Sequence, residues 1–91
     1  MATAEFDPTA AWRLDPQVAI RPEPFGALAY HYGNRRLTFL RDPALVDVVR
    51  SLEDHDSPDA ALAASGVEAR RWPAFRTALS SLADSDVIRA R

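Results

Sequence analysis

The sequence predicts an α+β fold in which a three-stranded antiparallel sheet is followed by three helices, in the order βββααα. Two observations support this prediction. Between residues 18 and 40, apolar residues recur with a period of two, and Pro and Gly interrupt the pattern. Beyond residue 42, apolar residues recur with helical spacing, and proline twice follows a helix-capping residue. Ninety-one residues make one domain with a small core.

The predicted strands occupy residues 18–21, 27–32 and 35–40. The first is a short β-branched run. It ends at Pro22 and Pro24, because proline cannot donate a hydrogen bond to a sheet ladder.

The second and third strands are predicted to form a hairpin, with Gly33-Asn34 as a two-residue turn. In the second strand, large side chains share one face: Leu28, Tyr30 and Tyr32. The other face carries Ala27, Ala29 and His31. In the third strand, Leu37 and Phe39 share a face, opposite to Arg36, Thr38 and Leu40.

Asp42-Pro43 predicts the start of the first helix, with Asp as the N-cap and Pro in the first turn. The apolar stripe of this helix is Leu45, Val48, Val49 and Leu52. Ser57-Pro58 repeats the signal and predicts a short helix over residues 59–65. Gly66 is suited to end that helix.

The third helix is predicted to begin close to Arg71 or Trp72, because Pro73 is tolerated only in a first turn. It should run to about Ala83. Its apolar stripe consists of Trp72, Phe75, Leu79 and Leu82.

The two ends of the chain are expected to differ. Residues 1–11 are polar and Ala-rich, so we expect a flexible tail anchored at most by Phe6. Residues 12–91 should form the folded domain. At the other end, residues 86–88 should form a short apolar tail packed on the core.

The composition excludes several classes of protein. There is no cysteine, hence no disulfide and no thiolate metal site. No apolar run is long enough to span a membrane, and the N-terminus lacks the features of a secretory signal. We therefore expect a cytoplasmic protein without membrane contact. The net charge is −2, and all eleven basic residues are arginine, which suits carboxylate partners better than phosphate backbones.

The sequence also lacks a catalytic motif. It contains no Gly-rich phosphate loop and no HExxH, CxxC or GxSxG pattern. The two histidines, His31 and His55, lie far apart in the sequence. His31 is best explained as an exposed or hydrogen-bonded strand residue, and His55 as a helix-end residue. We expect no enzyme activity, no metal and no cofactor.

Two features suggest a peptide-binding groove. The third strand, if it lies at the sheet edge, offers unpaired backbone groups, and arginines gather at the start of the third helix. An extended peptide that added to this edge as a fourth strand would gain main-chain hydrogen bonds, and the arginines would favour acidic residues.

The stretches RPEPFGALAYHYGNRRLTFL (residues 21–40) and WPAFRTALSSLADSDVI (residues 72–88) resemble the PqqD-like family of peptide-recognition domains, also called RiPP recognition elements. More narrowly, they resemble the peptide chaperones of mycofactocin biosynthesis. The resemblance covers about residues 12–88 and implies a winged-helix-like fold. The chain departs from the broader family where PEPFGALAYHYG replaces the usual PEG-type strand, which leaves the peptide register open.

The resemblance implies a partner and a site. Domains of this kind bind the leader of a ribosomally made precursor peptide along the third strand, and present the peptide to a radical SAM maturase that carries the iron–sulfur clusters. Carried onto this chain, the strand residues are Arg36, Leu37, Thr38, Phe39, Leu40 and Arg41. The helix residues are Arg71, Trp72, Phe75, Arg76 and Leu79.

Two other functions remain as alternatives. The first is a winged-helix nucleic-acid-binding domain, against which the net charge of −2 argues. The second is a structural subunit that joins an enzyme and has no peptide groove. We expect a monomer, with a dimer through the open sheet edge as the alternative.

Overall fold

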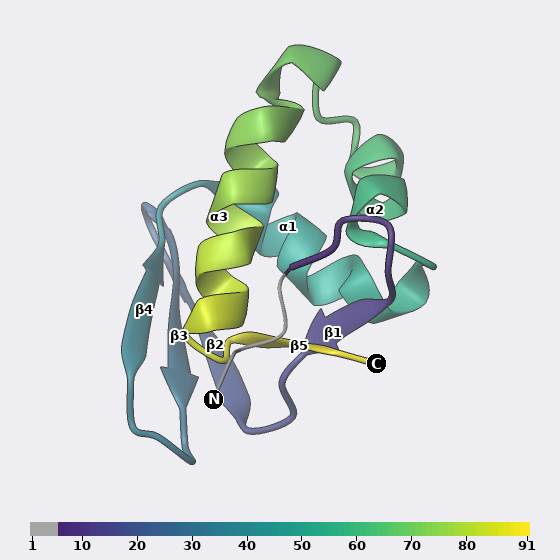
Figure 1. The fold of residues 1–91 in the computed structure, drawn as a ribbon. Helices are drawn as coiled ribbons and strands as arrows, with labels where there is room; N and C mark the ends of the chain where they lie inside the picture. Colours follow the sequence, from purple (N-terminus) through teal and green to yellow (C-terminus); the bar gives the residue numbers. More distant parts are fainter. Residues whose placement is uncertain (1–5) are drawn as a thin grey trace.

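The computed structural model describes residues 6–91 as one α+β unit (Figure 1). Its strands are β1 (Trp12–Leu14), β2 (Val18–Glu23), β3 (Gly26–His31), β4 (Leu37–Leu40) and β5 (Ile88–Ala90). Its helices are α1 (Pro43–Ser51), α2 (Pro58–Ser65) and α3 (Trp72–Asp84), with short 3-10 turns η1 (Leu52–Asp54) and η2 (Ala69–Arg71). In the described part of the chain, no helix has the length and apolar character needed to cross a membrane.

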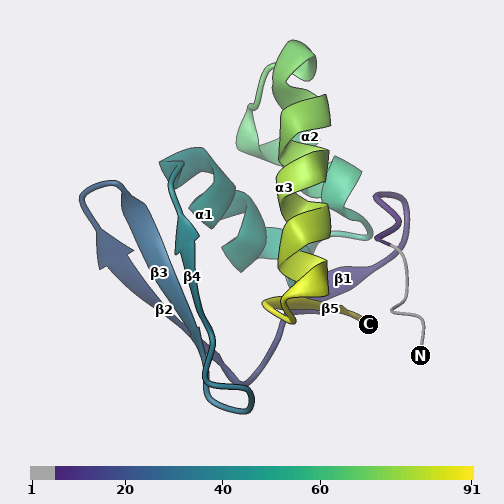
Figure 2. The ribbon, with the colours of Figure 1, turned by 60° about the vertical axis from the view of Figure 1, so that its left-hand side comes forward.

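The predicted three-stranded antiparallel meander followed by three helices is confirmed, with strand order β2-β3-β4. Figures 1 and 2 show the helices on one side of this sheet, while its other side is uncovered. Ala27, Ala29 and Leu40 on the helix side are at most 1% exposed. The small side chains of Ala27 and Ala29 let the helices approach the sheet closely, while Leu40 fills the core.

A second sheet was not anticipated from the sequence. Strands β1 and β5 pair antiparallel, with Trp12 opposite Ala90 and Leu14 opposite Ile88. The apolar tail over residues 86–88 is nonetheless buried as expected, since Val87 and Ile88 are 2% and 1% exposed. The pairing joins segments more than seventy residues apart, and three-residue strands have no local pattern that would reveal it.

The predicted two-residue turn at Gly33-Asn34 is wrong. The loop is longer: the N–H of His31 donates to the carbonyl of Arg36 at 3.0 Å, and β4 begins only at Leu37. The Nδ1 atom of buried His31 accepts the N–H groups of Gly33 and Asn34 at 3.0 and 3.1 Å. His31 therefore holds the loop through its side chain, which a turn dipeptide does not reveal. Arg35, at φ 61°, takes the left-handed position.

Strand β2 continues two residues beyond the predicted end, because Pro22 lies opposite Ala27 on an edge strand where a missing donor is tolerated. The turn into β3 depends on Gly26, whose φ is 145°. A Cβ atom at this residue would lie 2.1 Å from the carbonyl oxygen of Leu40. The close approach of these two backbones requires glycine here.

The helix starts are as predicted. Oδ1 of Asp42 accepts from the N–H of Ala44 at 2.9 Å, and Oγ of Ser57 accepts from the N–H of Ala60 at 3.1 Å. Gly66, at φ 79°, ends α2. The predicted stripes of α1 and α3 pack into one core with Leu62, Val87 and Ile88.

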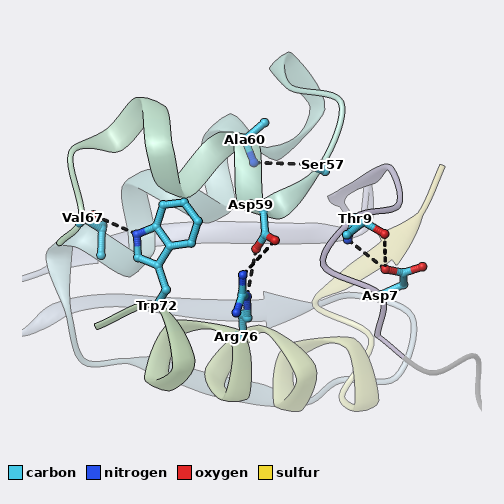
Figure 3. A network of polar contacts seen from close by, with 8 residues as sticks. All are labelled: Asp7, Thr9, Ser57, Asp59, Ala60, Val67, Trp72 and Arg76. Atoms are coloured by element: carbon cyan, nitrogen blue, oxygen red, sulfur yellow. Dashed lines mark hydrogen bonds and ion pairs between the residues drawn. The ribbon is translucent and has the colours of Figure 1, made fainter. Parts of the chain in front are cut away.

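The described part of the predicted N-terminal tail contacts the domain; its residues 1–5 lie outside the described residues. The rings of Phe6 and Trp12 have centroids 5.1 Å apart, and Nε1 of Trp12 donates to the carbonyl of Asp7. The side chain and backbone of Thr9 donate to the carboxylate of Asp7 (Figure 3) and hold its pKa below the ordinary value. Pro8 accepts from the N–H of Asp59.

Candidate functional site

The open edge of β4 is the first part of the site. Strand β4 is terminal in its sheet and pairs with β3 alone among the described strands. The carbonyl of Arg36 points to β3, since it accepts from His31. Because backbone groups alternate in direction along an antiparallel strand, those of Thr38 also face β3, and those of Leu37 and Phe39 face the open edge.

A pocket of about 330 Å³ is the second part. It lies between α3 and the beginning of α1. One of its lining residues, Asp42, is two residues beyond the end of β4. Its lining residues are Asp42, Leu45, Arg70, Arg71, Ala74, Phe75 and Ala78. The lining is mainly apolar with arginines at the rim, so it suits an apolar side chain with an acidic neighbour.

Arg71 connects the two walls of this pocket. Its Nη2 atom lies 2.6 Å from Oδ2 of Asp42, and its guanidinium lies 5.1 Å from the ring centroid of Phe75. The side chain of Arg71 remains 46% exposed. A peptide carboxylate can therefore reach the guanidinium without displacing a buried group.

Arg76 and Trp72 lie on a different face of α3, toward α2 (Figure 3). Arg76 donates two hydrogen bonds to the carboxylate of Asp59, at 3.0 and 2.9 Å. The bond to Asp59 raises the pKa of Arg76 above its ordinary value. Nε1 of Trp72 donates to the carbonyl of Val67 at 2.9 Å. The structure thus does not bring these two side chains to the pocket.

The remaining predicted residues differ in their exposure. Leu40 and Leu79 are fully buried in the core. Leu37 and Phe39 are 61% and 55% exposed on the uncovered face of the sheet, and Arg41 is exposed beside them. Arg36 is exposed at the position before β4, and Thr38 is half-buried. The guanidinium of Arg41 lies 5.2 Å from the ring centroid of Phe39.

Sequence reasoning missed part of the pocket: Asp42, Leu45, Arg70, Ala74 and Ala78. A signal was present, because residues 71, 74, 75 and 78 follow the spacing of one helix face. The described residues contain no cluster of potential metal ligands.

Comparison with known proteins places this chain in a family. The chain is 48% identical to "Peptide chaperone MftB" of Mycolicibacterium smegmatis over 83 residues, which are 91% of this chain and 81% of that protein. It is 49% identical to the protein of the same name from Mycobacterium ulcerans, over 91% of this chain and 76% of that protein. It is 45% identical to the protein of that name from Mycobacterium tuberculosis, over 94% of this chain and 79% of that protein.

No solved structure matches the chain. The model of one protein family matches residues 11–89, which include every helix and nearly all strand residues of the described fold. Together with the three relatives, this match shows that the chain belongs to the peptide chaperone MftB family.

Proposed function

We propose that this peptide chaperone binds the leader segment of a precursor peptide by strand addition to β4, and presents the precursor to a radical SAM enzyme of mycofactocin biosynthesis. Membership of a chaperone family agrees with the expectation that the chain is not an enzyme. The observation that carries the proposal is the open edge of β4 beside an apolar, arginine-rimmed pocket. The precursor is made by ribosomes, so the proposed place of action is the cytoplasm.

The leader would add antiparallel or parallel to β4 and bond to the outward backbone groups of Leu37 and Phe39. Alternate leader side chains would then point to the helix side of the sheet, where the pocket lies, and to the uncovered side. Arg71 and Arg70 would attract a leader carboxylate near the pocket. In this proposal Phe75 forms the pocket wall, and Arg76 and Trp72 hold α3 against α2.

Isothermal titration calorimetry with a synthetic leader peptide tests the proposal. Because ordering the leader costs free energy, we expect a Kd of about 0.1–10 μM. A leader with its residues in scrambled order is the control and should bind at least about tenfold more weakly. The proposal would be contradicted if leader at tens of micromolar produced no heat in the titration and no chemical-shift change in an NMR spectrum of the chaperone.

A further inference from the structure

The uncovered face of the sheet carries an apolar surface that lies outside the pocket. Its large side chains are Phe25, Tyr32, Leu37 and Phe39, which are 39%, 63%, 61% and 55% exposed. Such side chains give a patch on the order of 400 Å², as large as the largest apolar patch on many monomers, and such patches are often functional. We call this surface, together with Leu28 and Tyr30 between its members, the outer face.

The outer face is continuous across the sheet. Phe25 and Phe39 make an edge contact with ring centroids 5.9 Å apart, and Tyr30 and Tyr32 make another at 5.1 Å. Leu28 lies opposite Phe39, and Tyr30 lies opposite Leu37. These side chains therefore hold one another in place before any partner binds, which lowers the entropy cost of association.

Arginines border this surface. The side chain of Arg21 is 78% exposed at 3.6 Å from Glu23, and Arg41 stacks on Phe39. Residues 18–41 contain four arginines and a single acidic residue, Glu23, although the whole chain has a net charge of −2. The partner that complements this surface is apolar at its centre and acidic at its rim.

Charge argues against two other occupants. A second copy of this chain, docked face to face by two-fold symmetry, would bring arginines against arginines. An anionic membrane is usually recognised through clusters of four to eight Lys or Arg residues, whereas the four arginines of residues 18–41 lie at three separate places in this segment and form no single cluster.

The leader site is separated from this surface by the sheet. The pocket lies on the helix side, whereas Leu28, Tyr30, Leu37 and Phe39 lie on the other. We infer that the outer face docks the modifying enzyme, through an apolar patch of that enzyme bordered by carboxylates, while the groove holds the leader. This inference rests on the proposed function, since it assigns a surface to the enzyme that the function requires.

The two sites meet at β4. A leader strand added to β4 would place alternate side chains beside Leu37 and Phe39 and so widen the outer face. The enzyme would then contact chaperone and leader together. Bound leader should therefore raise the affinity for the enzyme several-fold, and bound enzyme should raise the affinity for the leader by the same factor.

The test uses the full chain, the leader peptide and the purified radical SAM enzyme, with both affinities measured for each variant. The variant of the outer face combines Arg21→Glu and Tyr32→Ser, two exposed positions away from the β4 edge. We expect it to lose at least tenfold in affinity for the enzyme and to keep leader affinity within twofold. The charge-matched control is Arg89→Glu on β5, in the other sheet, which should change neither.

The groove variant is Ala74→Trp, which fills the pocket from an exposed helix position. It should lose leader affinity and keep the affinity for the enzyme measured without leader. If the outer-face variant binds enzyme as the unmodified chain does, the inference is wrong while the proposed function stands. If the unmodified chain binds no leader, the proposed function fails first. Binding to vesicles with 30% anionic lipid, or a dimer that Arg21→Glu strengthens, would assign the outer face to another occupant.

Discussion

Nη2 of Arg71 lies 2.6 Å from Oδ2 of Asp42, and Oδ1 of the same carboxylate caps α1 through the N–H of Ala44. One carboxylate thus joins the end of β4, the start of α1 and the start of α3. The pocket opens at this junction. The width of the proposed groove consequently depends on a contact between residues 29 positions apart.

Replacement of Asp42 should show which of its two bonds matters for stability. Asp42→Ala removes the cap and the ion pair, and should lower the free energy of unfolding by about 1–2 kcal/mol. Arg71→Ala keeps the cap and removes the half-exposed ion pair together with the contact on the Phe75 ring, and should cost at most about 1 kcal/mol. Urea denaturation of both variants measures the difference, and equal losses would mean that the cap contributes nothing.

Proline substitutions along β4 should separate folding from leader binding. In Phe39→Pro the lost N–H faces the open edge, so the domain should fold while leader affinity falls at least tenfold. In Thr38→Pro the lost N–H faces β3, so the sheet itself should be destabilised, by about 1–3 kcal/mol for the β3 carbonyl left without its donor. Circular dichroism and calorimetry measure the two effects.

Phe39→Ala is the control for the ring of Phe39, since it removes the side chain but keeps the N–H. A Phe39→Pro variant that binds leader as Phe39→Ala does would show that this edge does not receive the peptide.

Arg71 at the end of η2 and Arg76 in α3 should differ in their effect on leader binding. Arg71→Gln should weaken binding about fivefold to tenfold, because a guanidinium at the pocket rim is lost. Arg76→Gln should change it less than twofold, since its guanidinium is bonded to Asp59 on the side of α2. Fluorescence anisotropy with a labelled leader distinguishes them. The reverse order of effects would place the leader on the α2 side of the helix.

Gly26 should not tolerate a side chain. Gly26→Ala combines a φ of 145° with a Cβ atom 2.1 Å from the carbonyl oxygen of Leu40. We expect a loss of about 2–3 kcal/mol in the free energy of unfolding. Gly66→Ala is a matched control with positive φ and open space around the Cβ position, and should cost about 1 kcal/mol. Thermal denaturation of both variants tests this, and equal losses would contradict the backbone clash.

Much of the fold could be predicted because its signals are local. Asp42 and Ser57 cap their helices by accepting the N–H groups of residues two and three positions further along the chain. The apolar stripes of α1 and α3 could be recognised from spacing alone, and their members are buried. The resemblance stated from residues 21–40 and 72–88 also pointed to the family that the comparisons show.

The site was predicted only in part, for the same reason. Phe75 and Arg76 were both predicted to bind the peptide. The spacing along the helix could not tell which other segment of the chain packs against each of its faces. The carboxylate of Asp59 decided this for Arg76, and that of Asp42 decided it for Arg71. A partner many residues away leaves no periodic trace in the sequence.

By itself, the sequence determined the kinds and order of the main elements, since caps, prolines and apolar periods act within a few residues. Only the tertiary structure decided that β1 pairs with β5, that the side chain of His31 holds the loop before β4, and that Leu37 and Phe39 remain exposed. The physical reason is that strand pairing and burial depend on segments far apart in the chain, which meet only when the domain packs.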